Sequence, residues 1–283
     1  MTKLLQDRIE AIAKKVSIKQ KGNKKSSGDQ KEDGGCVNHV LPCVSDNKRA
    51  IPNSILRSSL FGVVGKGARE YQKDVLKATV GGITIKYTGD QLDQSDLDVY
   101  LECLRRLSNI PLGNHVRFSV YNFLKSLNRN TGKRDHEWIK CCFVRLTYCT
   151  VEINDCKIYY TGHLINEMFR DETSGEFVIS LNKSISVLFS DKKWTGLQLK
   201  ERETLSGKQL AKWLHGFFSS HDKPFPYKVD TLRVLCGSDV KVLKTFKQKL
   251  KKALTDLSIA TEWKCWIDEN DLVRIKKKKV YIQ

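Results

Sequence analysis

The sequence has no apolar run that approaches the roughly 18 to 20 residues needed to span a bilayer, and its first residues lack the charged and then apolar pattern of a signal peptide. Acidic residues are also scarce, because 32 Asp and Glu stand against 50 Lys and Arg and leave a formal net charge of +18 at pH 7. A charge of this size attracts polyanions. Hydrophobic residues make up 40 % of the 283 residues, enough for two or three folded domains. We therefore expect a soluble, intracellular protein whose partner is a polyanion such as nucleic acid.

Common catalytic and metal-binding motifs are also missing. The segment GVVGKGAR at 62–69 does not complete the phosphate-binding motif Gly-x-x-x-x-Gly-Lys-Ser/Thr. There is no His-x-His pair, as in strand-nicking replication enzymes, and no His-x-x-Arg, as in tyrosine recombinases. The nine cysteines show no paired framework and no Cys-x-x-Cys, so we expect thiols; Cys36, His39 and Cys43 have ligand-like spacing but no evident fourth ligand. We predict no metal, no cofactor and no enzymatic activity.

Residues 1–48 are predicted to form an N-terminal arm and a flexible linker. Apolar residues recur at helical spacing between residues 1 and 19, which indicates a short amphipathic helix. This helix is either an arm for a partner or a second copy, or a marginal helix on a tail, since isolated helices of this length are marginal in water. Residues 22–35 are polar and rich in glycine and lysine, so we expect a flexible linker there.

Ordered structure is expected from about residue 49. Residues 49–95 are predicted to be a connecting segment with a strand at 83–87, followed by a helix at 96–107 that Ser95 and Asp98 would cap. A strand at 115–120, a short helix and a longer helix at 134–148 come next, and the longer helix would bury Ile139, Cys142, Phe143 and Leu146. Strand segments at 151–160 and a hairpin of 163–170 with 176–181 complete this part.

A similar order of elements recurs nearer the C-terminus. Ser206 is predicted to cap one helix, Asp230 a short helix that stops at Gly237, and Ser238 a helix at 239–257. Two strands around a turn at 268–271 follow. A three-residue, glycine-containing turn between two helices is typical of a helix-turn-helix, and the strand pair behind it is typical of a wing.

The predicted fold class is therefore α+β, with two tandem winged-helix domains behind a flexible N-terminal arm. Each domain is a helix-turn-helix plus a β-hairpin, and we place the first at 96–198 and the second at 199–283. The repeat lies in the order of the elements rather than in the amino-acid letters.

The clearest functional element is the lysine-rich segment VKVLKTFKQKLKKAL at 240–254, in which no acid occurs between Asp239 and Asp256. Apolar residues at spacings of three and four define a core face. The opposite face carries Lys241, Lys244, Thr245, Gln248, Lys251 and Lys252. As the third helix of a winged helix it would lie in the DNA major groove, with lysines on phosphates and Thr245 and Gln248 on base edges. The alternative is a solvated basic face, although such faces normally mix both signs.

Two further basic regions are predicted to contact DNA. Arg274, Lys276 and Lys277 follow the last strand, where a wing touches phosphates or the minor groove; the alternative is a disordered basic tail. In the first unit Lys133, Arg134 and Lys140 would contact DNA, but Glu137 lies among them, so an ordinary exposed face is the alternative.

Four blocks of the sequence resemble one known family. They are RAIPNSILRSSLF at 49–61, ITIKYTGDQL at 83–92, FFSSHDKPFPYK at 217–228 and DTLRVLCGSD at 230–239. In this order and spacing they resemble the TrfA family of plasmid replication initiators over about residues 49–276. The resemblance implies two winged-helix domains that bind directly repeated iterons in double-stranded origin DNA, melt an adjacent AT-rich segment, and contact its single strands. It also implies recruitment of the host sliding clamp and helicase-loading machinery in the bacterial cytoplasm, with active monomers and dimers that limit copy number.

Two motifs are carried over from this resemblance. RSSLF at 57–61 is similar to a family motif that docks into the sliding clamp, with Leu60 and Phe61 as the matching residues. Adjacent large apolar side chains can fill a partner's pocket, and the alternative is that both pack in the protein's own core. The helix that opens at Gly237, Ser238 and Asp239 corresponds to the family's second recognition helix.

Other functions also fit these residues. A winged-helix regulator of transcription or copy number, or a partition protein, would bind DNA without opening its strands. A nicking or joining enzyme would leave a cleaved or covalently bound strand. A nonspecific DNA compactor would not distinguish iterons from random DNA.

Overall fold

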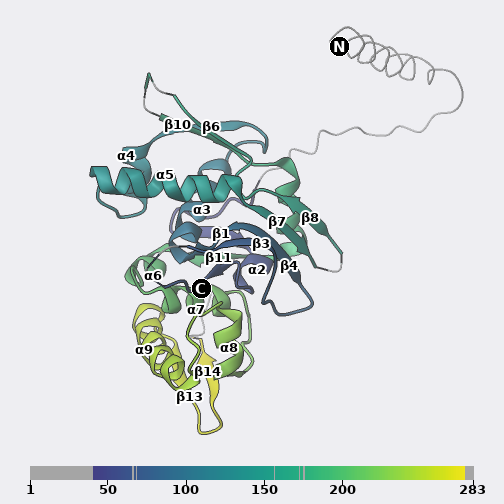
Figure 1. Cartoon of the computed structure of the whole chain (residues 1–283), viewed down its shortest axis with the longest axis vertical. Coiled ribbons are helices and arrows are strands. Elements are labelled where there is room, and N and C mark those ends of the chain that lie inside the picture. The colour runs from purple at the N-terminus through teal and green to yellow at the C-terminus, as the bar shows by residue number, and fades with distance from the viewer. Residues whose placement is uncertain are drawn as a thin grey trace, which may run out of the picture. The chain divides into compact units, whose positions relative to one another are not determined.

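The computed structural model describes residues 41–277, except residues 66, 68, 156, 172 and 175 (Figure 1). The predicted N-terminal helix and linker lie outside these residues, as do Cys36 and His39 of the possible metal cluster. Within the described residues the chain mixes helices and strands, as the sequence predicts. All seven cysteines described there are free thiols, which confirms that part of the prediction.

The first part of the chain builds small sheets around helices. Strand β1 (Lys48–Pro52) pairs antiparallel with β11 (Trp194–Gln198), and β2 (Phe61–Gly62) pairs with β5 (Leu92–Asp93). A four-stranded sheet has the order β3 (Tyr71–Lys77), β4 (Thr84–Asp90), β7 (Thr150–Asn154) and β8 (Tyr159–Gly162). A three-stranded sheet has the order β6 (His115–Ser119), β10 (Glu176–Ser180) and β9 (Glu167–Arg170). The helices are α2 (Asn53–Leu56), α3 (Gln94–Leu107), α4 (Val120–Ser126), α5 (Lys133–Tyr148) and the 3-10 segment η1 (Lys183–Lys192).

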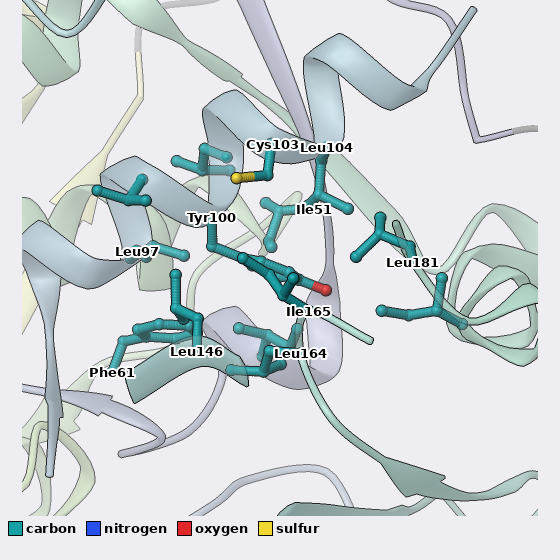
Figure 2. Packing of buried hydrophobic residues seen from close by; sticks show 14 of the residues in the cluster. Ile51, Phe61, Leu97, Tyr100, Cys103, Leu104, Leu146, Leu164, Ile165 and Leu181 are labelled. Carbon is teal, nitrogen blue, oxygen red and sulfur yellow. The ribbon is translucent and has the colours of Figure 1, made fainter. Parts of the chain in front are cut away.

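These elements enclose one hydrophobic cluster that extends from Leu41 to Leu197. Figure 2 shows Tyr100 of α3 among residues of distant segments, with Ile51, Phe61 and Leu146 around it. The predicted buried face of α5, Ile139, Cys142, Phe143 and Leu146, is fully buried. Residues 49–95 supply much of this cluster through β1, α2 and β4, so they pack as part of it rather than only connecting two domains.

Helix α3 begins two residues earlier than predicted, and its cap is different. Asp93 accepts hydrogen bonds from the backbone N–H groups of Ser95 and Asp96, while the side chain of Asp96 accepts one from Asp93 N. The predicted cap of Ser95 with Asp98 is therefore wrong. Asp98 instead binds Arg202 and Lys212, and Ser95 Oγ accepts from Gln209.

The second part of the chain builds a separate hydrophobic cluster from residues 205–275. Its helices are α6 (Leu199–Thr204), α7 (Gln209–Ser219), α8 (Val229–Leu235) and α9 (Leu243–Thr261). Its sheet has the order β12 (Tyr227–Lys228), β14 (Leu272–Lys276) and β13 (Lys264–Ile267). In Figure 1 helices α8 and α9 and the β13–β14 hairpin lie together, in light green to yellow.

The caps predicted for this part are wrong. Helices α7, α8 and α9 follow Lys208, Lys228 and Val242, so Ser206, Asp230 and Ser238 are not their N-caps. Helix α9 begins four residues later than predicted because the preceding residues close α8: Gly237 adopts a φ of +62°, and Ser238 N donates to Arg233 O. Residues 236–242 therefore form a longer connection than a three-residue turn, and Lys241 precedes the helix.

The two clusters are joined by polar contacts and by close backbone approaches. Trp213 Nε1 donates to Ser58 O at 3.1 Å, and Val63 N donates to Cys236 O at 2.8 Å. A Cβ placed on Gly62 would lie 3.3 Å from Cys236 O, and one on Gly237 would lie 3.2 Å from the Ser59 Cβ. Because these approaches are so tight, a side chain at Gly62 or Gly237 would force the two parts to shift slightly at this joint.

A buried ion cluster reinforces the joint. Asp98 of α3 accepts from Arg202 Nε of α6 at 2.5 Å and also from Lys212 of α7. The side chain of Arg202 is only 3 % exposed. These ions therefore connect α3, in the first cluster, to both helices that open the second part.

No helix within residues 41–277 is both long enough and apolar enough to cross a membrane.

Candidate nucleic-acid interface

Helix α9 separates an apolar face from a basic one. Phe246, Leu250, Leu254 and Leu257 are buried, as predicted, whereas Leu243 at the first position is 42 % exposed. This sharp division follows from the spacing of three and four residues between the apolar positions. It leaves the opposite side of the helix to solvent.

The predicted DNA-contacting residues of α9 all lie on the surface. Lys241, Lys244, Thr245, Gln248, Lys251 and Lys252 are exposed. Within the part of the chain that the structure describes, none of these lysines forms an ion pair with an acidic side chain. Lys247 differs, because it binds Asp271 at the turn of the β13–β14 hairpin. The exposed side of α9 is therefore a continuous region of uncompensated positive charge.

The hairpin residues are more constrained than the sequence suggests. Arg274 Nε donates to Asp268 Oδ2 at 2.6 Å, and Lys276 is exposed. Lys277 Nζ donates to His221 O at 2.5 Å and lies 5.1 Å from the centre of the Trp263 ring, and burial lowers the pKa of Lys277. The side chain of Arg274 is still 42 % exposed but is held by Asp268, whereas Lys276 is exposed and forms no ion pair among the described residues.

Helix α5 carries the basic residues predicted for the first unit. Lys133 and Arg134 are exposed in its first turn, and the half-buried Lys140 donates to Glu137 at 3.0 Å. Arg145 is drawn inward, where it donates to the buried Asp96 of α3 at 2.6 Å. That ion pair fixes α5 on α3 and so determines which side of α5 faces solvent.

A groove of about 510 Å³ lies between α4, α5 and the β9–β10 hairpin. Lys133 and Lys140 line it, together with three residues that the sequence reasoning missed: Tyr121, His136 and Arg170. Tyr121 is 52 % exposed, and the ammonium of Lys125 lies 5.7 Å from the centre of its ring. The signal that could have found these residues is basic and aromatic side chains on the elements that flank a predicted recognition helix.

Leu60 and Phe61 lie in the hydrophobic core rather than on the surface. They are 0 % and 2 % exposed, and the ring of Phe61 stacks on that of Tyr100 with the centroids 6.1 Å apart (Figure 2). This is the packing alternative considered for the pair. Docking into a sliding clamp would require both side chains to leave the core.

No group of three or more His, Cys, Asp or Glu side chains that could hold a metal ion occurs within residues 41–277 outside the undescribed positions. The possible cluster with Cys43 lies partly outside the described residues.

Comparisons with known proteins place these elements in a family. The chain is 26 % identical over 241 residues, or 82 % of its length, to the plasmid replication initiator protein TrfA of Escherichia coli, and it spans 62 % of that protein. A crystal structure of domains 2 and 3 of RctB shares the fold, with a TM-score of 0.53, 12 % identity, and coverage of 80 % of this chain and 96 % of that one. A crystal structure of the Pi initiator protein in complex with iteron DNA has a TM-score of 0.47 and 16 % identity, and the match covers 63 % of this chain and 88 % of that one. Since the model of the TrfA protein family matches residues 6–277, this chain belongs to the TrfA family.

Proposed function

We propose that the chain is a plasmid replication initiator that binds directly repeated iterons in double-stranded origin DNA, promotes opening of an AT-rich segment, and recruits host replication proteins. The observation that carries the proposal is the uncompensated lysine face of α9 in a chain that the TrfA family model covers over residues 6–277. A basic face on a helix beside a hairpin suits the phosphate backbone and the major groove.

Two winged-helix domains provide the DNA-binding surfaces in this proposal. The first combines α3, α4 and α5 with the β9–β10 hairpin, and the second combines α7, α8 and α9 with the β13–β14 hairpin. The predicted boundary between 198 and 199 fits the division of the two hydrophobic clusters. We assign residues 49–95 to the first domain because their buried side chains belong to its cluster.

The two domains contribute different contacts. Lysines 244, 251 and 252 bind phosphates, while Thr245 and Gln248 meet base edges. In the first domain Lys133 and Lys140 line the groove at α5, and Arg134 is exposed beside Lys133. Neutralising six to ten phosphates in all would make the affinity fall steeply with salt.

The host partners follow from the family and not from a visible docking surface. A sliding clamp could use Leu60 and Phe61 only after these residues leave the core, so clamp binding and local opening of residues 53–62 are one event in this proposal. Helicase-loading proteins, active monomers and dimers that limit copy number complete it, and we place the protein with its plasmid in the bacterial cytoplasm.

The proposal is tested by selecting bound duplexes from a random DNA pool at about 150 mM salt, which suppresses purely electrostatic binding. We expect one long motif that matches direct repeats next to an AT-rich tract on a plasmid. Permanganate reactivity on a supercoiled plasmid carrying those repeats then reports strand opening. A motif without opening would leave a DNA-binding regulator, and the absence of any motif would contradict sequence-specific initiation.

A further inference from the structure

The outward face of α5 changes its chemistry along the helix. Lys133 and Arg134 begin it, and Glu137 follows one turn later. Further along, the exposed positions are apolar: Cys141 presents an exposed thiol, Val144 is 43 % exposed and Tyr148 is 78 % exposed. This succession leaves an apolar stripe in the second half of a helix that starts with positive charge.

The stripe belongs to one face and is not the edge of the core. Cys141, Val144 and Tyr148 are separated by three and four residues, which places them one above the other on a helix. The core of the first cluster takes the opposite face, where Ile139, Cys142, Phe143 and Leu146 are 0 % exposed. The bond between Arg145 and Asp96 holds this orientation.

The surroundings of the stripe favour DNA over another protein. Lys133, Lys140 and Arg170 line the groove beside α5 together with one acid, Glu137, which pairs with Lys140, so the charge on this flank of the helix is mainly positive. One valine, one thiol and one tyrosine also offer far less area than the roughly 800 Å² per partner that a stable protein interface buries. A narrow apolar stripe beside a mainly basic flank suits the major groove, where the phosphates flank the bases.

We propose that Val144 and Cys141 read the C5-methyl groups of thymine in the major groove. Thymine is the base that presents a methyl group there, and apolar side chains contact it in DNA-binding helices. Recognition helices read bases through residues spaced at three, four and seven along one face, and Glu137, Cys141 and Val144 have that spacing. This assignment rests on the proposed function and adds to it which base the first domain recognises.

The test compares thymine with deoxyuridine, which differs only by the missing methyl group. The probe is a 30-base-pair duplex of the motif selected from the random pool, with each thymine replaced in turn. We expect the wild-type protein to bind about four-fold more weakly for each methyl group that is read, the factor that burial of one such group gives. Val144→Ala should bind the thymine and deoxyuridine duplexes equally at one of those positions.

Val234→Ala is the matched control, because Val234 is an exposed valine of α8, 53 % exposed, that lines a different groove beside β3. It should retain the wild-type sensitivity to deoxyuridine. Thermal unfolding should show that Val144→Ala is folded, since alanine is a better helix former than valine.

Three results would overturn the inference. Deoxyuridine that leaves wild-type affinity unchanged everywhere would exclude methyl reading, and undiminished sensitivity in Val144→Ala would place that reading elsewhere. A changed sedimentation coefficient of Val144→Ala, with its deoxyuridine sensitivity intact, would make the stripe a contact between two copies. In all three the selected motif is still bound, whereas failure to select any motif would contradict the proposed function itself.

Discussion

Helices α5 and α9 occupy the same place in two similar successions of elements, yet their outward faces differ. The face of α9 carries Lys244, Lys251, Lys252, Thr245 and Gln248, with Lys241 just before the helix, and no acid occurs between Asp239 and Asp256. The face of α5 carries a guanidinium, a carboxylate, a thiol, a valine and a tyrosine in succession. Lysines attract any phosphate, whereas side chains of different chemistry can distinguish one base from another.

The difference teaches that charge alone does not predict which helix distinguishes bases, because a lysine binds any phosphate. The most basic helix gives the clearest signal in the sequence, but its outward face is mostly lysine, with Thr245 and Gln248 as its uncharged members. In our proposal α9 supplies most of the affinity, and α5 supplies much of the base recognition. The experiments below either separate these two contributions or weaken the joint between the two clusters, which holds both helices in place.

The largest expected effect is on stability and comes from weakening the joint between the two clusters. Asp98→Asn removes the charge that binds Arg202 and Lys212 across the joint and leaves two cations poorly compensated. We expect the free energy of unfolding to fall by about 3 kcal/mol, measured by urea denaturation. The control Asp230→Asn removes an exposed ion pair with Arg233 and should cost less than about 1 kcal/mol. Equal losses in the two variants would contradict a structural role for the joint.

A second variant isolates the contribution of α9 to affinity. Replacing Lys244, Lys251 and Lys252 together with alanine should remove about three phosphate contacts. When the salt concentration rises from 50 to 200 mM, the factor by which affinity falls should then be about 40-fold smaller for this variant than for the wild type. Specific and random duplexes should be affected alike. The charge-matched control replaces Lys73, Lys157 and Lys200, which are exposed elsewhere. If the control changes the salt dependence as much, α9 has no particular role.

Two single substitutions on α9 sharpen the comparison within one helix. Gln248→Ala should narrow the gap between motif and random DNA by about 1 to 3 kcal/mol, because a side-chain amide can pair with adenine. Lys244→Ala should weaken both kinds of DNA by a similar factor. Titrations of both variants against both duplexes measure this. If both variants change the ratio of motif affinity to random-DNA affinity equally, Gln248 has no role in base reading that Lys244 lacks.

The smallest expected effect is a loss of stability at low pH, which arises at the joint between the two clusters and not in α5 or α9. Burial would raise the pKa of Asp98, but the charges of Arg202 and Lys212 outweigh it and hold that pKa below its ordinary value. Because the unfolded chain binds the proton more readily, the contribution of Asp98 is complete above about pH 4 and is lost as the pH falls through the lower folded-state value. Wild type should therefore lose more stability than Asp98→Asn between pH 5 and pH 3, as followed by thermal unfolding. Parallel curves would contradict this.

The parts of the fold set by local periodicity are those that the sequence predicts well. Helix α5 begins within one residue of its predicted position and buries the four predicted residues, because apolar spacing alone determines that face. Caps are predicted poorly, since several Ser and Asp residues near each start compete and tertiary contacts decide among them. Asp98 illustrates this. The sequence predicts its carboxylate as part of a helix cap, but Arg202 and Lys212, which lie far away in the sequence, bind it instead.

Long-range pairing limits prediction of both the fold and the site. Strand β1 pairs with β11, so residues 49–95 join a core whose other side lies far along the chain. Leu60 and Phe61 look like an exposed anchor in isolation, but that core covers them. The groove with Tyr121 and Arg170 forms only when α4, α5 and the hairpin come together. Whether any of these surfaces contacts DNA stays a prediction.

The tight joint between the two parts also bears on how such proteins diverge. At this joint Val63 N donates to Cys236 O, a bond between main-chain atoms, and a side chain at Gly62 would press against the same oxygen, so substitutions can do little to change the spacing there. The distance between α5 and α9, the helices that we propose bind DNA, would then be inherited unchanged while their outward side chains drift. We expect relatives that share this joint to recognise repeats of nearly constant length and of widely different sequence.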